Sequence, residues 1–140
     1  MIKLTKGAPP EKLTEKFVQE GTANFKKTKI SVWNVQWLKD ALLNLSHKKC
    51  AYCEMNLERE SKYMEVEHFR DKSQYPDDVL KWENLLPSCK HCNGHKSAHD
   101  VVAEPIINPF VDVPKEHIYL KSYVSVQNRR IARTDRCAYL

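Results

Sequence analysis

Long apolar runs, export signals and repeats are all missing from this sequence. No apolar stretch approaches the roughly 20 residues that a membrane-spanning helix needs, and residues 1–6 lack the apolar segment of a secretion signal. There is no internal repeat and no low-complexity tract. We therefore expect a protein without a membrane partner that works in the reducing cytoplasm, where closely paired cysteines bind metal more often than they form disulfides.

The composition is that of a globular protein. Of the 140 residues, 41% are hydrophobic and 29% are charged, which excludes a compositionally disordered chain. The length suits one small domain, or a compact motif with flanking segments, and the core of such a domain is modest. A bound metal ion is therefore a useful additional source of stability.

The formal net charge of +5 is unevenly distributed. Residues 1–50 carry ten lysines against four acidic residues, whereas residues 51–103 carry seven basic and ten acidic residues. Residues 104–140 carry six basic and four acidic residues. An acidic centre between basic flanks suits a site that holds a cation while its surroundings attract phosphate groups. Ordinary solvated lysines give the same pattern, so charge alone does not separate the two interpretations.

Four of the five cysteines form two Cys-x-x-Cys pairs. Cys50 and Cys53 form the first pair, and Cys89 and Cys92 form the second. Four thiolates at this spacing satisfy the tetrahedral preference of zinc and fill all four positions, so we predict a closed, structural zinc site. Disulfides are the alternative, which the expected compartment disfavours. A redox role is disfavoured because no βαβ pattern surrounds either pair, and Cys137 is interpreted as a free thiol.

A short helix is predicted near the start of the chain. Residues 11–20 have helix-forming composition, and Gly21 is expected to end the helix. Residues 25–29 form a lysine-rich connector, which we interpret as a solvated loop more readily than as a contact with a nucleic-acid backbone.

A second helix is predicted over about residues 32–46, with Ser31 as its N-cap. Its apolar residues recur at intervals of three and four and form one stripe. That periodicity already accounts for Trp33 and Trp37, so we interpret both as core residues and not as base-stacking side chains.

Strand, loop, strand and helix follow one another in the region of the cysteine pairs. Residues 63–69 alternate and predict a strand, and residues 82–86 predict a second short strand that ends at Pro87. Ser88 is a suitable N-cap for a helix over about residues 89–99. This order is a ββα unit, and it predicts an α+β fold.

The sequence divides into three segments. Residues 1–49 are an N-terminal helical segment, and residues 50–103 contain the ββα unit with its cysteine pairs. Residues 104–140 form an extended, basic C-terminal segment, in which residues 117–126 alternate weakly and predict a hairpin or an edge strand.

A histidine and several oxygen donors accompany the predicted strands. His68 has the pKa range of a general base, and a carboxylate such as Glu67 together with an amide oxygen suits a hard ion such as Mg²⁺. Each residue alone is more often structural. Neighbours in a regular strand also point to opposite faces, so the pattern alone does not place Glu67 and His68 in one site.

The order of these residues resembles the motif of zinc-containing HNH endonucleases. The resemblance covers about a third of the chain. It is carried by Cys50, Cys53, Val66, Glu67, His68, Phe69, Asn84, Leu85, Cys89, Cys92, Asn93 and Lys96.

This resemblance implies a ββα-metal (His-Me finger) fold and a set of roles. His68 would be the general base, Glu67 and Asn93 would bind a catalytic Mg²⁺ or Mn²⁺ ion, and Asn84 would hold the loop and His68 in place. Many HNH sites have Asp where this chain has Glu67, which changes the ligand geometry expected there.

Lys96 and three histidines lie on or near the predicted helix. Lys96 is expected either to approach a phosphate or to be solvated on the helix surface. His91, His95 and His99 are possible substitutes in metal or phosphate contact, and we expect none of them individually to take that role.

A narrower resemblance extends over more of the chain. The segments that carry it are 2–13, 50–54, 66–73, 82–89 and 107–109. They are similar to the PtuB-type HNH nucleases of Septu and related retron anti-phage systems, which act beside an ABC-type ATPase, PtuA. The resemblance implies a nuclease effector that assembles with such an ATPase. Proteins of this type usually continue further than this chain.

We therefore expect a metal-dependent endonuclease that hydrolyses DNA phosphodiester bonds, with low sequence specificity because no major-groove reading module is present. One alternative is an RNA- or tRNA-cleaving HNH nuclease, since a general base and metal ligands of these types do not distinguish DNA from RNA. The other is a zinc-stabilised module that binds nucleic acid or protein without cutting.

Overall fold

The structure is a computed structural model that describes residues 1–58, 64–121 and 124–127, with side chains described as far as residue 118. The elements confirm an α+β fold. The helices are α1 (Glu15–Thr28), α2 (Gln36–Leu45) and α3 (Lys90–Lys96), the strands are β1 (Met64–His68), β2 (Leu85–Cys89), β3 (Ile118–Lys121) and β4 (Val124–Gln127), and short 3-10 turns cover Pro76–Asp78, Trp82–Asn84 and Pro114–Glu116.

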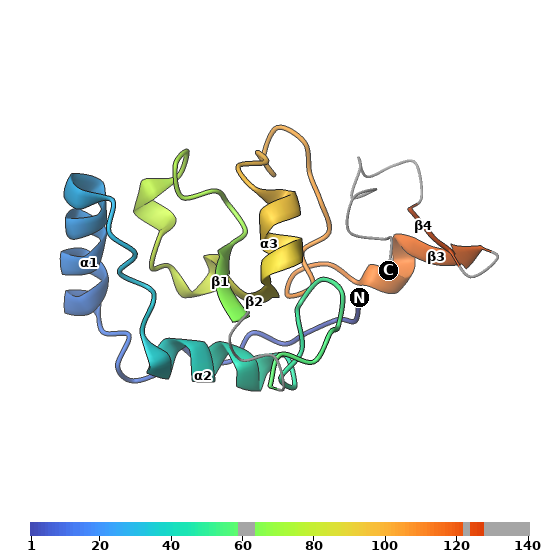
Figure 1. The fold of residues 1–140 in the computed structure, drawn as a ribbon, viewed down its shortest axis with the longest axis horizontal. Helices are drawn as coiled ribbons and strands as arrows, with labels where there is room; N and C mark the ends of the chain where they lie inside the picture. Colours follow the sequence, from blue (N-terminus) through green and yellow to red (C-terminus); the bar gives the residue numbers. More distant parts are fainter. Residues whose placement is uncertain (59–63, 122–123, 128–140) are drawn as a thin grey trace.

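The predicted ββα unit lies at the centre of the molecule (Figure 1). β1 and β2 pair antiparallel with Met64 opposite Cys89 and His68 opposite Leu85. α3 follows β2 directly and contacts both strands, while α2 contacts them as well. The helix and the sheet together hold the two cysteine pairs and the ends of β1 in fixed positions.

The second strand begins at Leu85 and not at residue 82, because residues 82–84 form a 3-10 turn, and it continues through Pro87, where the sequence predicts its end. Pro87 lies opposite Val66, and its carbonyl accepts a hydrogen bond of 2.9 Å from the Ala51 N–H, outside the two-stranded ladder. In an antiparallel pair the N–H and C=O groups of one residue point to the same side. The missing N–H of proline therefore removes no bond of the sheet.

The helix that follows begins one residue later than predicted and is shorter. Cys89, not Ser88, is the N-cap of α3, and the Cys89 sulfur accepts a hydrogen bond of 3.3 Å from the Cys92 N–H. The helix ends at Lys96 because Ser97 has a positive φ of 46°. A metal-site cysteine thus also caps the helix.

Gly21 does not end the first helix. α1 runs through it to Thr28, so the predicted lysine-rich connector is the last helical turn. Lys29, with φ 59°, ends the helix instead. A Cβ atom added at Gly21 would lie 2.4 Å from Leu80 Cδ1, so the glycine permits close packing of α1 against the chain near residue 80.

The second helix begins at Gln36 and not near residue 32. Its N-cap is Val35, which makes no capping bond with its side chain, so Ser31 is not the cap. Trp33 therefore precedes the helix. Trp33 is nevertheless buried, and its ring contacts that of Phe25 edge-on at 5.3 Å. The core assignment is confirmed for Trp33, and Trp37 packs partly buried against Phe17.

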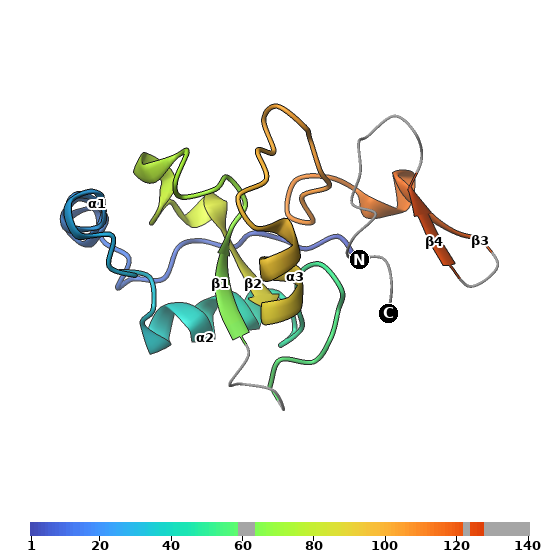
Figure 2. The same ribbon diagram turned by 45° about the horizontal axis from the view of Figure 1, so that its top comes forward.

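The first ten residues are extended and cross the molecule beside the sheet (Figure 2). The Leu4 N–H donates to the Pro109 carbonyl at 2.8 Å. The Lys6 amine lies 4.4 Å from the centre of the Trp82 ring and donates to the Leu85 carbonyl. The same core takes in buried residues from Leu4 to Cys92, and the division into three segments stays a prediction.

The antiparallel pairing of β3 with β4 confirms the hairpin predicted for residues 117–126. The basic end of the chain and Cys137 lie outside the described residues.

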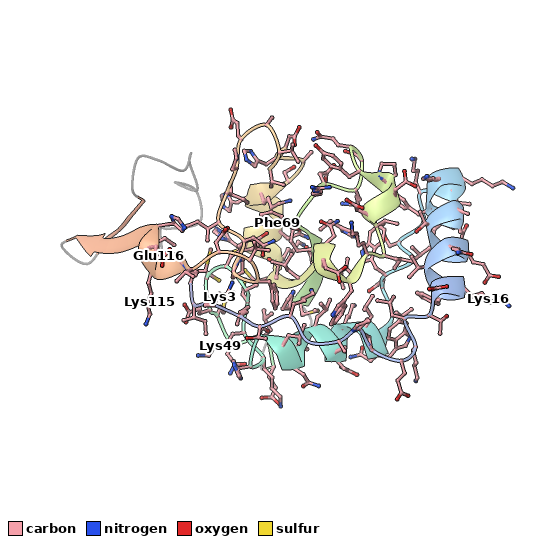
Figure 3. All side chains as sticks on the ribbon, turned by 180° about the vertical axis from the view of Figure 1, so that it is seen from behind. Lys3, Lys16, Lys49, Phe69, Lys115 and Glu116 are labelled. Atoms are coloured by element: carbon pink, nitrogen blue, oxygen red, sulfur yellow. The ribbon has the colours of Figure 1, made fainter. Side chains whose placement is uncertain are left out.

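Figure 3 places Lys16 on α1 and Lys115 near β3 at opposite ends of the molecule, so these two lysines do not share a basic patch. None of the helices in the described residues combines the length with the apolar composition that a membrane span needs.

Candidate metal centre and active site

The four cysteines of the two pairs come together as predicted. The sulfurs of Cys50, Cys53, Cys89 and Cys92 all lie within 4.8 Å of one another, and all four residues are free thiols. The sulfurs of Cys53 and Cys89 are 3.8 Å apart. Sulfurs bound at about 2.3 Å around a tetrahedral ion are also about 3.8 Å apart. The arrangement is therefore positioned to bind a metal ion.

Turns in the backbone bring the first pair to the second. The Cys50 N–H donates to the Met55 carbonyl at 2.9 Å, and the Glu54 N–H donates to the Cys50 carbonyl at 3.0 Å. Glu54 has a φ of 63°, which completes the turn. The Cys89 N–H donates to the Cys50 sulfur at 3.4 Å. Backbone donors thus already stabilise negative charge on the sulfurs.

The thiols influence one another strongly because they are buried together. Contacts from Cys53 and Cys92 hold the pKa of Cys50 far below its usual value. The contact with Cys50, together with burial, raises the pKa of Cys53 to about 12. A thiol beside a negatively charged sulfur loses its proton less readily, so a bound cation would favour the thiolate form of all four cysteines.

His68 ends β1 and is buried, with 3% of its surface exposed. Its ring contacts that of Trp33 edge-on, with the centroids 4.4 Å apart. Its Nε2 atom lies 2.9 Å from the carbonyl oxygen of Val79. A carbonyl only accepts, so Nε2 carries the proton and Nδ1 holds the lone pair of the neutral ring. Burial lowers the pKa of His68 to about 4.

Glu67 is equally buried, and its partner is Lys96 of α3. The Lys96 Nζ atom lies 2.7 Å from Glu67 Oε1, with about 5% of either side chain exposed. The same Nζ donates to the His68 carbonyl at 2.8 Å. Burial raises the pKa of Glu67 to about 7, and the Lys96 charge opposes that rise. The solvated position considered for Lys96 is therefore wrong, because buried ion pairing holds the amine inside.

Asn84 joins the loop after β1 to the start of β2. Its Oδ1 accepts from the Arg70 N–H at 2.7 Å, and its Nδ2 donates to the Arg70 and Asp78 carbonyls at 3.1 Å each. In addition, the Phe69 N–H donates to the Asn84 carbonyl at 2.9 Å. These bonds fix the chain immediately after His68.

Asn93 of α3 contacts Glu65, which is two residues before Glu67 on β1. Its Nδ2 donates to the Glu65 carboxylate. Alternation along a strand puts Glu65 and Glu67 on one face, and α3 covers that face through both contacts. His68 lies on the other face, against Trp33.

The structure thus arranges the predicted site residues around the end of β1, but in two groups. Glu67, Lys96 and Asn93 lie between β1 and α3, whereas His68 lies on the side of Trp33 and Val79. Their catalytic and ligand roles stay predictions.

Sequence reasoning missed three contacts: Trp33 with His68, Glu65 with Asn93, and Lys96 with Glu67. The i, i+2 spacing of Glu65 and Glu67 was a signal for shared placement. The sequence carries no comparable signal for the Trp33 contact.

The comparison with known families agrees with this geometry. The family model of the HNH endonucleases matches residues 50–99, which contain both cysteine pairs, β1, β2 and α3. Residues 50–99 are therefore similar to an HNH endonuclease domain, and they combine helix, a small antiparallel sheet and four cysteines positioned to bind a metal ion.

The chain is also similar to two particular proteins. The Septu protein PtuB of Bacillus thuringiensis is 54% identical over 112 residues, which cover 80% of this chain and 40% of that protein. The Septu protein PtuB of Bacillus mycoides (strain KBAB4) is 30% identical over a match that covers 60% of this chain and 38% of that protein. The chain therefore spans about two fifths of the length of these relatives, and the predicted PtuB-type resemblance is confirmed.

Proposed function

We propose that this chain is a metal-dependent endonuclease that hydrolyses DNA phosphodiester bonds. The observation that supports this most is the state of His68 within the HNH domain. Its Nε2–H donates a hydrogen bond to the Val79 carbonyl, and its lowered pKa keeps the ring neutral near pH 7. The lone pair on Nδ1 is then free to accept a proton from the attacking water.

Glu67 and Asn93 are proposed to hold the catalytic ion, Mg²⁺ or Mn²⁺. The donor types fit, because carboxylate and amide oxygens are ligands for hard ions. The position fits as well, because the Glu67 carboxylate already holds a cation, the Lys96 ammonium, at 2.7 Å. When bound, the ion supplies electrostatic stabilisation of the charge that develops on phosphate and leaving oxygens. Lys96 must leave Glu67 Oε1 before another cation can bind there, and the released amine is then available to a phosphate.

The four cysteines are proposed to hold a structural zinc ion. All four positions around the ion are filled by sulfur, which leaves none for a reactive water. The ion would fix the turn after α2 to the start of α3, and so hold α3 against the strand that carries Glu67 and His68. Its role is to position these side chains.

Similarity to Septu proteins supports a place in anti-phage defence. We propose that the chain is the nuclease part of such a system and acts with an ABC-type ATPase of the PtuA kind. Because the chain spans about two fifths of the PtuB relatives, contacts with that partner need not all lie within it. Cleavage in the cytoplasm would agree with the reduced thiols of the metal site.

A plasmid-nicking assay with Mg²⁺ or Mn²⁺ tests the nuclease proposal, with the ATPase partner added in parallel reactions. His68→Ala should abolish nicking while one zinc ion per chain is retained. His47→Asn is the matched control: His47 is an exposed histidine with φ 52°, which asparagine tolerates. Single-stranded RNA and tRNA are assayed beside duplex DNA, because faster cleavage of either RNA would replace DNA as the proposed substrate.

A non-catalytic binding module is the second candidate, and the burial of the site favours it. Glu67 and His68 are each only 3% exposed in this conformation. A binding module would show no cleavage with any metal, and His68→Ala would leave its affinity for nucleic acid unchanged. That pair of results would replace the nuclease proposal.

A further inference from the structure

Two exposed histidines meet on the surface of α3. His91 and His95 lie one turn apart, and their Nε2 atoms are 2.9 Å from each other. Their ring centroids are 4.2 Å apart with an interplanar angle of 63°. Residues at positions i and i+4 are neighbours on a helix surface. Both rings are open to solvent, so a ligand can reach the two nitrogens directly.

The distance between these nitrogens suits shared coordination of a metal ion. Imidazole nitrogens bind at about 2.0–2.1 Å, so two of them on one ion are roughly 2.9 Å apart at a right angle and roughly 3.3 Å apart at a tetrahedral angle. In the observed contact one Nε2 must donate to the other, which requires at least one neutral ring. Small rotations of two exposed rings would turn both lone pairs toward a common point.

This pair is separate from the two sites already described. Asn93 lies midway between His91 and His95 in sequence, and each helical residue is rotated by about 100°. The two histidines are therefore roughly 200° around the helix from Asn93, whose side chain faces Glu65 of β1. Neither histidine belongs to the four-cysteine cluster. Cys89 and Cys92 hold the first turn of α3, so the backbone that carries His91 is already fixed.

We propose that His91 and His95 form a second metal site, which binds one transition-metal ion through both Nε2 atoms. Imidazole ligands select ions such as Ni²⁺, Cu²⁺ and Zn²⁺ over Mg²⁺. Two protein ligands leave positions for water or for a donor from another molecule. The ion is therefore held more weakly than in the four-cysteine site, and a mild chelator removes it first. This inference does not depend on the proposed nuclease activity.

The test is a titration of the zinc-loaded full chain with Ni²⁺ by calorimetry, and with Cu²⁺ by electron paramagnetic resonance. The wild-type chain should bind one Ni²⁺ per chain, and its Cu²⁺ spectrum should show coupling to two nitrogens. His91→Asn and His95→Asn should each weaken Ni²⁺ binding at least about tenfold, since loss of even an outer-shell partner costs 10–100-fold in affinity.

His99→Asn is the matched control, because the Nε2 atom of His99 is bonded to the Glu104 carbonyl and not to another ring. It should bind Ni²⁺ as the wild type does. The zinc content and the helical circular dichroism of every variant are measured, so that damage to α3 or to the cysteine site is recognised. Unchanged Ni²⁺ affinity in His91→Asn and His95→Asn, or an equal loss in His99→Asn, would overturn the proposal.

Discussion

Replacing Lys96 by methionine should destabilise the protein in a way that depends on pH. The ion pair with Glu67 is 2.7 Å long and about 95% buried on both sides. Removing one member of a buried pair costs about 3–5 kcal/mol when the other stays charged. The pKa of Glu67 is already raised to about 7, so at pH 6 the carboxyl is mostly neutral and no such charge is left behind.

The expected loss at pH 6 is therefore that of the hydrogen bond to the His68 carbonyl, about 1 kcal/mol. At pH 9 the wild type has the full ion pair, and the variant must either bury a lone carboxylate or keep Glu67 protonated. The loss should then reach about 3 kcal/mol, at the lower end of the range for buried pairs. Urea unfolding at both pH values, followed by tryptophan fluorescence with saturating zinc, measures the two losses.

Two further variants make this result specific. Glu67→Gln combined with Lys96→Met removes both charges, and it should recover most of the stability lost at pH 9. Lys81→Met breaks a pair between the exposed Lys81 amine and the partly buried Asp78, 3.7 Å apart. Asp78 keeps its ion pair with Arg70, so this change should cost less than about 1 kcal/mol at either pH. Equal losses for Lys96→Met at pH 6 and pH 9 would refute the assignment of a charged, buried Glu67–Lys96 pair.

Three other predictions concern stability. The pKa of His68 is about 4, below the ordinary 6.5, so its contribution to the free energy of unfolding is present above pH 6.5 and is lost as the pH falls toward 4. This term amounts to about 3 kcal/mol, and the unfolding free energy of His68→Gln should fall correspondingly less over that range than that of the wild type. Gly21→Ala should cost about 1–3 kcal/mol, because the new methyl group would lie 2.4 Å from Leu80; Gly94→Ala, which meets nothing within 4 Å, should stabilise by roughly 0.5–1 kcal/mol. Thermal or urea unfolding measures each change, and a Gly21→Ala protein as stable as the wild type would contradict the close packing at α1.

The metal cluster and the ββα unit could be predicted from the sequence because their determinants are local. Each Cys-x-x-Cys pair has a spacing that a single turn satisfies, and alternation near residue 64 predicts a strand. Errors arose where tertiary packing overrides local preference. Gly21 remains helical because α1 packs closely on Leu80. Pro87 stays in a strand because its N–H side faces away from the ladder.

The residues of the candidate site could be predicted from the sequence, but the contacts that their side chains make could not. Alternation along β1 correctly predicts that Glu67 and His68 point to opposite faces of the strand. The partners of these side chains come from elements distant in sequence, namely Lys96 on one face and Trp33 on the other. A buried lysine and a surface lysine look alike in a sequence. Helical spacing predicts that Trp33 is a core residue, but it does not identify the ring that Trp33 contacts.

Anomalous diffraction from crystals of the zinc-loaded protein soaked in Mn²⁺ tests the proposed active site most directly. We expect a manganese peak within bonding distance of the Glu67 carboxylate, with the Lys96 amine displaced from its position 2.7 Å from Oε1. A manganese peak elsewhere, with Lys96 still bound to Glu67, would contradict the account.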